Sequence, residues 1–91
     1  MKSVRARITG RVQGVGFRAW TEQMATRLGV SGWVRNRRDG SVEAVIAGDA
    51  GKVDEMLTMC WQGPPSAVVD AVNVEDVPPP AGRGFAMRPT H

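Results

Sequence analysis

Residues 10–18, with the sequence GRVQGVGFR, combine the residue types that bind phosphate. They join a segment with strand-like alternation to a segment with helical spacing. The first N–H groups of a helix have no partner inside that helix, and they attract anions. Gly14 and Gly16 permit the backbone angles that turn several amides toward one point, and they keep side chains away from a bound phosphate.

Arg18 stands at the mouth of this loop, and its planar guanidinium is suited to two phosphate oxygens at once. Without an anion, the positive end of the helix would repel this side chain by roughly a few tenths of a kcal/mol. The alternative is a purely structural role: the glycines make a tight turn, and Arg18 is a surface residue of the first helical turn that binds no ligand. The phosphate site that we predict consists of the Arg18 guanidinium and the amides of Gln13, Gly14, Val15, Gly16, Phe17 and Arg18.

Asn36 lies near the end of a second strand-like segment, within the sequence GWVRNRRDG. A carboxamide can accept a hydrogen bond from water while donating another, so it orients the water without removing its proton. A right-handed crossover makes the first two strands parallel, which puts Asn36 at the same end of the sheet as residues 12–18. Parity with Val34 turns its side chain to the helix-covered face. The alternative is an asparagine that bonds its own backbone beside the Asp39-Gly40 turn.

The single cysteine and the single histidine of the chain argue against disulfide, thiol and metal chemistry. Cys60 has no partner for an internal disulfide, and His91 is the single histidine, so we expect no metal site and no cofactor. Cys60 follows apolar residues at helical spacing and has no nearby histidine, which favours a buried thiol over a nucleophile. The chain has neither a run of about 20 apolar residues nor a secretory signal pattern at its start. We therefore expect a cytoplasmic chain with no membrane partner.

Hydrophobic periodicity predicts the elements that position these residues. Strand-like alternation covers residues 4–9, 32–37, 41–46 and 72–75. Helical spacing covers residues 17–28 and 53–61, with Trp61 on the apolar stripe of the second helix. Asp39-Gly40 indicates a hairpin turn in which both central residues take positive φ. A proline-rich connection leads to a last short segment, residues 85–88, for which the pattern defines no pairing partner.

The order strand, helix, strand, strand, helix, strand is that of the ferredoxin-like split β-α-β fold. We therefore predict an α+β fold in which both helices cover one face of an antiparallel sheet. A chain of 91 residues has room for one core, so residues 1–91 should form a single domain. The odd-numbered residues of the first strand then face away from the helices, which puts Arg5 and Arg7 on the open face.

The net charge of +3 hides an asymmetry between the two halves of the chain. Residues 1–40 carry nine Lys or Arg against two acidic residues, which makes +7, whereas residues 41–91 carry three against seven, which makes −4. An electropositive half favours an anionic partner, either a small phosphorylated molecule or a nucleic acid. A solvated, arginine-rich sheet face would produce the same count.

The two motifs together resemble the signatures of the acylphosphatase family. In the first, the matching residues are Gly10, Val12, Gln13, Gly14, Val15, Phe17 and Arg18; in the second, they are Gly32, Val34, Asn36, Asp39 and Gly40. The resemblance extends over nearly the whole chain, including Gly63-Pro64 after the second helix.

This resemblance implies a hydrolase acting on small-molecule acyl phosphates, with Arg18 as substrate binder and Asn36 as the residue that positions water. It implies no cofactor or metal, and we expect a monomer. The competing hypothesis is a non-catalytic module of the same fold that binds RNA or a phosphorylated ligand. RNA-binding modules of this kind stack bases on sheet aromatics, and Trp33 is the one aromatic residue here that is placed to serve as a platform.

Overall fold

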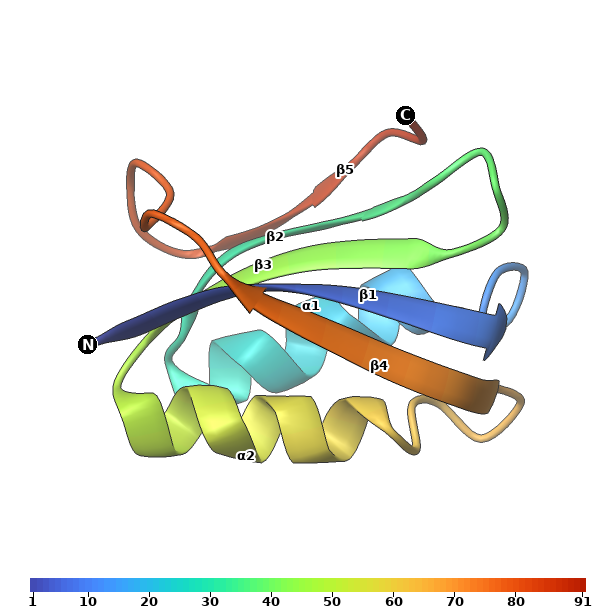
Figure 1. Cartoon of the computed structure of the whole chain (residues 1–91), viewed down its shortest axis with the longest axis horizontal. Coiled ribbons are helices and arrows are strands. Elements are labelled where there is room, and N and C mark those ends of the chain that lie inside the picture. The colour runs from blue at the N-terminus through green and yellow to red at the C-terminus, as the bar shows by residue number, and fades with distance from the viewer.

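Five strands form one sheet in a computed structural model that describes residues 1–91, and both helices pack on the same face of that sheet (Figure 1). The strands are β1 (Lys2–Arg11), β2 (Ser31–Asn36), β3 (Val42–Gly48), β4 (Val68–Asp76) and β5 (Phe85–Arg88). The helices are α1 (Phe17–Leu28) and α2 (Ala50–Cys60). The predicted ferredoxin-like order is confirmed, with β5 as an additional strand. Neither helix has the length and apolar run needed to cross a membrane.

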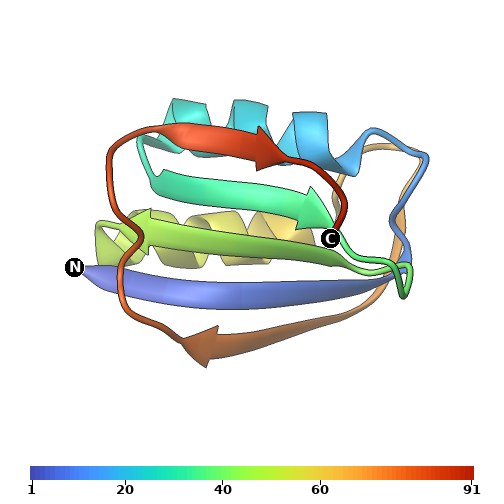
Figure 2. The same cartoon turned by 90° about the horizontal axis from the view of Figure 1, so that it is seen from above.

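The sheet has the strand order β4-β1-β3-β2-β5; its four predicted strands pair antiparallel as expected, and the added β5 makes the whole sheet mixed. The pairs of β1 with β3, β1 with β4 and β2 with β3 are antiparallel, whereas β5 runs parallel to β2. The chain after β4 crosses to the other edge at the end of the sheet where β4 finishes, and then turns back (Figure 2). A strand that returns from that end necessarily runs parallel to β2, and it covers an edge whose backbone groups would otherwise be unpaired.

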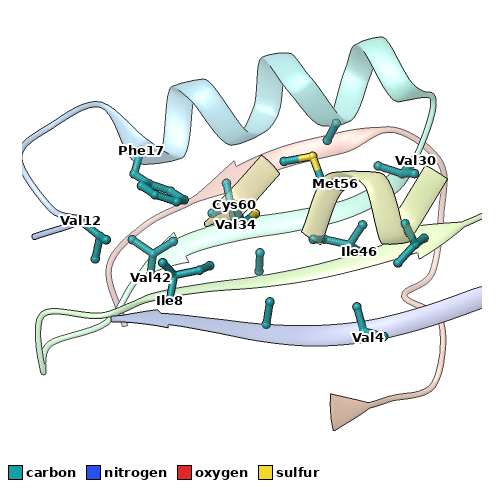
Figure 3. Packing of buried hydrophobic residues seen from close by; sticks show 14 residues of the cluster. Val4, Ile8, Val12, Phe17, Val30, Val34, Val42, Ile46, Met56 and Cys60 are labelled. Carbon is teal, nitrogen blue, oxygen red and sulfur yellow. The ribbon is translucent and has the colours of Figure 1, made fainter. Parts of the chain in front are cut away.

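The core lies between the helices and the inner face of the sheet (Figure 3). Val4, Ala6 and Ile8 of β1 are fully buried, as the period of two predicts, and Val34 of β2 belongs to the same core cluster. Burying each larger aliphatic side chain contributes about 1.5–3 kcal/mol to folding. Arg5 and Arg7 lie on the opposite face, as expected from their parity.

The second helix ends one residue earlier than its apolar stripe suggests. Cys60 is its last residue and is completely buried, and burial raises the pKa of its thiol to about 12, so the thiol stays protonated. Trp61 follows as the C-cap and is 53% exposed, which corrects its assignment to the core. The buried-thiol interpretation of Cys60 is confirmed.

Gly32 is the glycine on which the sheet depends most directly. Its φ is +139°, and a Cβ added there would lie 1.8 Å from the carbonyl oxygen of Val45 on β3. We expect Gly32→Ala to lower the free energy of unfolding by about 3 kcal/mol or more, because rigid backbone blocks the added atom. Urea denaturation measures this loss. Gly29→Ala is the matched control: its φ is +73° but its Cβ position is open, so it should cost about 1 kcal/mol.

Candidate active site

The loop between β1 and α1 presents an unbroken row of unpaired amides. None of the N–H groups of residues 13–18 donates a hydrogen bond within the protein. Gly14 and Gly16 have φ of +73° and +81°, the left-handed conformation that the sequence predicted for them. Gly16 is also the N-cap of α1, which has no capping side chain and no acidic residue in its first turn. The positive end of this helix is therefore available to an anion.

Two buried side chains anchor the loop at its ends. Val12, just before the first unpaired amide, is 1% exposed, and Phe17, the first residue of α1, is 2% exposed; both belong to the core cluster. The ring of Phe17 packs edge-on against Trp20, with centroids 5.4 Å apart. Because the core holds both ends and Val15 also packs against it, the loop keeps its amides in a fixed arrangement.

Arg18 lies in the first turn of α1 and reaches across to the last strand. Its Nη1 donates a hydrogen bond to the carbonyl oxygen of Arg88, at 3.1 Å, and it has no acidic partner. One of its five guanidinium N–H donors is therefore used to fix its direction, while the others remain for a ligand. Strand β5, for which the residue pattern defines no pairing partner, thus supports this side chain.

Asn36 is the last residue of β2, at the same end of the sheet as the loop. Figure 2 shows the loop, the β2–β3 turn and the C-terminal residues gathered at this end. Asn36 pairs with Val42, whose side chain is in the core, so its own side chain is on the helix-covered face, as parity predicted. That side chain makes no hydrogen bond in the protein, whereas its backbone oxygen accepts one from the amide of His91 at 3.1 Å. The alternative of an asparagine bonded to its own turn is therefore wrong.

Strand β5 also brings Arg18 and Asn36 into one neighbourhood. Arg88, whose carbonyl holds the Arg18 guanidinium, is the register partner of Arg35, the residue before Asn36. The two predicted site residues are therefore linked through β5, which contacts Arg18 and pairs with the strand that ends at Asn36. They lie at one end of the molecule, together with the unpaired amides of the loop.

Gln13 contributes through its side chain, which the sequence did not suggest. Its Nε2 donates to the carbonyl oxygens of Arg37, at 2.7 Å, and Ser41, at 2.9 Å. These bonds tie the loop between β1 and α1 to the β2–β3 turn directly after Asn36. No local pattern signals this link, because the bonded residues are 24 and 28 positions apart.

The β2–β3 turn differs in type from the predicted hairpin. Gly40 has φ of +95°, but no residue other than glycine has positive φ, so Asp39 does not adopt the second left-handed conformation. The backbone N–H of Arg37 donates to the carbonyl oxygen of Ser41 at 2.8 Å. This bond closes a three-residue loop with glycine in its last position. Hydrogen bonds from the hydroxyl and amide of Ser41, together with nearby arginines, hold the pKa of the Asp39 carboxyl below its usual range.

The electropositive first half of the chain is largely an arginine-rich open face. Five of its nine cations are in ion pairs: Lys2, Arg5, Arg7, Arg35 and Arg37. Most of their carboxylate partners come from the second half of the chain, so the halves neutralise each other across the sheet. Arg18 is among the cations that remain without a carboxylate, which leaves its charge available to a ligand.

Replacing Gln13 by alanine should loosen the loop without removing any phosphate ligand. The change deletes two hydrogen bonds to carbonyl groups that each keep one backbone partner, so we expect a loss of about 1–2 kcal/mol in unfolding free energy. For the hydrolase activity that the resemblance implies, kcat/KM for an acyl phosphate should fall about tenfold, since a small misplacement of a positioned group is costly. Gln62→Ala, at an exposed position with no side-chain hydrogen bond, should leave both quantities unchanged.

Comparisons with known proteins agree with this geometry. The acylphosphatase family model matches residues 4–87. An acylphosphatase of Rhizorhabdus wittichii is 54% identical over 86 residues, which cover 94% of this chain and 87% of that protein. An acylphosphatase of Rubrobacter xylanophilus is 57% identical over 88 residues, with 96% and 80% covered. The solved structure of an acylphosphatase from Coxiella burnetii superposes with a TM-score of 0.91 at 33% identity, covering 96% of this chain and 92% of that one. The chain with this loop, this arginine and this asparagine belongs to the acylphosphatase family.

Proposed function

We propose that this protein is an acylphosphatase that hydrolyses the carboxyl-phosphate bond of acyl phosphates to a carboxylate and inorganic phosphate. The observation that carries the proposal is the row of unpaired amides at residues 13–18 beside the Arg18 guanidinium, which has no carboxylate partner. Family membership and identities above 50% to acylphosphatases support it. The protein is then a hydrolase acting on acid anhydrides, with a small molecule as its substrate.

In the proposed mechanism, the loop amides and Arg18 hold the phosphoryl oxygens while Asn36 aligns a water molecule for in-line attack on phosphorus. Phosphoryl transfer passes through a loose transition state, in which positioning and charge stabilisation matter more than covalent help. The Asn36 carboxamide accepts a hydrogen bond from the water and does not remove its proton. The proton of the water passes to the substrate itself.

The leaving group explains why the site can work without a general acid. The conjugate acid of a carboxylate has a pKa of roughly 4, so the departing group needs no proton at neutral pH. The phosphoryl charge is met by main-chain dipoles and one guanidinium. We therefore propose a reaction that is independent of metal ions and cofactors.

Hydrolysis of benzoyl phosphate tests the proposal directly. We expect turnover by the purified protein, with the same kcat in the presence and absence of EDTA, because the proposed ligands of the phosphoryl group are all protein N–H groups. Inorganic phosphate should inhibit competitively, since it is a product that fits the same amides. Absence of turnover in the folded protein, or complete loss of turnover with EDTA, would contradict this function.

The competing RNA-binding function is less well supported. Trp33 lies on the open face, but guanidinium carbons of Arg35 and Arg88 each lie 4.7 Å from its ring centroid. The ring therefore already has cationic partners where a base would have to stack. We propose that nucleic acid is not a ligand. Absence of salt-sensitive binding to single-stranded RNA would agree with this.

We further propose that residues 1–91 act as a single domain and as a monomer in the cytoplasm. The family model and the relatives span nearly the same length as this chain, which supports a one-domain enzyme. The single cysteine is buried and unpaired, which suits a reducing compartment. Sedimentation equilibrium at the mass of one 9.8 kDa chain tests the monomer.

A further inference from the structure

A buried carboxylate lies under the arginines of the open sheet face. The Glu43 side chain is 3% exposed, although no helix covers this face. Its Oε1 accepts hydrogen bonds from Arg35 Nε at 2.8 Å and from Arg37 Nη1 at 3.2 Å, and Arg5 Nη1 lies 3.7 Å from Oε2. Burial is the largest influence on its pKa and favours the neutral form, but these guanidiniums together outweigh it and hold the pKa below its usual range. Glu43 is therefore an ionised carboxylate whose ion-pair partners are all arginines.

The two arginines that bind Oε1 stand on either side of Asn36 in the chain. Alternation sends Arg35 and Arg37 to the open face and Asn36 to the helix-covered face. One oxygen atom of Glu43 thus restrains the residues before and after Asn36. This matters because Asn36 ends β2, and strand ends fray unless they are held.

The same network reaches the proposed phosphate loop, which is the segment with the unpaired amides of residues 13–18. The carbonyl oxygen of Arg37 accepts the hydrogen bond from Gln13 Nε2 at 2.7 Å. Glu43 is thereby linked through Arg37 to the loop that carries the amides, and through both arginines to the backbone of Asn36. Glu43, on the open face of the sheet, can in this way set the distance between the loop and Asn36, whose side chain is on the helix-covered face.

Binding of an external anion is the other use that this cluster suggests. A hollow of about 490 Å³ on the open face is lined by Arg5, Arg7, Arg35 and Arg37. Each of these guanidiniums already has a carboxylate partner, from Glu43, Glu75 or Asp39. An external anion would have to displace those partners, so the contacts favour an internal role.

We propose that Glu43 is a positioning residue for the hydrolytic reaction: through Arg35 and Arg37 it fixes the end of β2, so that the Asn36 carboxamide is held over the phosphate loop. This inference rests on the proposed function, in which Asn36 aligns the attacking water. Glu43 touches neither substrate nor water in this scheme. It should affect kcat and leave phosphate binding nearly intact, because the amides and Arg18 bind the phosphoryl group.

A double-mutant cycle between Glu43→Gln and Asn36→Ala tests the inference with benzoyl phosphate. Glutamine has the shape of Glu43 but cannot hold two guanidiniums by charge, so we expect kcat to fall about tenfold to a hundredfold. The inhibition constant of inorganic phosphate should stay within about twofold, because the binding groups are untouched. In the Asn36→Ala background, Glu43→Gln should cause no further loss, since the group that it positions is absent.

Glu75→Gln is the matched control, because Glu75 binds Arg5 on the same face but does not contact β2; its kcat should equal that of the parent. Arg37→Gln serves if Glu43→Gln does not fold, since it leaves Glu43 with Arg35 and Arg5 and should show the same non-additive loss. A parent-like kcat in a folded Glu43 or Arg37 variant, or losses that multiply with Asn36→Ala, would overturn the inference. If Asn36→Ala alone keeps the parent kcat, the proposed role of Asn36 fails, and the cycle shows this separately.

Discussion

Arg18→Gln is expected to lower kcat/KM for benzoyl phosphate by at least about 10²-fold. Arg18 is the side chain that stands beside the unpaired amides without a carboxylate partner, so its charge has no substitute in the loop. Glutamine keeps some hydrogen-bonding capacity but loses the permanent charge and the planar fork. In the proposed mechanism the guanidinium binds the phosphoryl group in both ground and transition states, so KM and the inhibition constant of phosphate should rise as well.

Two further variants and a stability measurement distinguish the charge of Arg18 from the planar shape of its guanidinium and from its effect on folding. Arg18→Lys keeps the charge without the fork, so its kcat/KM should lie between those of the parent and of Arg18→Gln. Arg27→Gln, in the last turn of the same helix, should leave activity unchanged. Thermal denaturation shows whether loss of the bond to the Arg88 carbonyl unfolds the protein. A folded Arg18→Gln protein with parent kcat/KM would remove Arg18 from the mechanism.

Asn36→Ala is expected to reduce kcat by about 10²- to 10³-fold while the phosphate inhibition constant stays within about twofold. The reason is the proposed division of roles, in which the loop and Arg18 bind phosphate and Asn36 acts on the water alone. The side chain makes no hydrogen bond in the protein, so its removal should change the unfolding free energy by less than about 1 kcal/mol.

Asn73→Ala provides the comparison for this variant, because Asn73 is an exposed asparagine on β4 with no side-chain hydrogen bond. It should retain full turnover. An Asn36→Ala protein that also binds phosphate poorly would mean that Asn36 is a phosphate ligand. A fully active one would show that the water is oriented by another group.

The two variants together give a pattern that neither gives alone. Loss of Arg18 should weaken binding and turnover, whereas loss of Asn36 should affect turnover only. A non-catalytic phosphate-binding module would show weaker phosphate binding with Arg18→Gln and no turnover to lose. The kinetic parameters therefore distinguish the enzyme from its competing hypothesis.

The sequence by itself determined the local parts of this protein. The bounds of α1 at Phe17 and Leu28 follow from apolar spacing and from glycines on both sides, which are short-range signals. The positive φ of Gly14 and Gly16 and the parity that sends Asn36 toward the helices are equally local. The position of Asn36 at the same end of the sheet as the loop (Figure 2) was also predictable, because the handedness of a crossover connection is nearly invariant.

Only the tertiary structure decided which distant groups would meet. Gln13 binds carbonyls 24 and 28 residues away, and the Arg18 guanidinium binds a carbonyl 70 residues away. The burial of Glu43 beneath arginines from two neighbouring strands depends on strand order, and alternation alone indicates a face but not its neighbours. The parallel pairing of β5 likewise depends on the edge that β2 leaves open. Periodicity acts over a few residues, whereas these contacts arise only after the sheet has assembled, so no local pattern carries them.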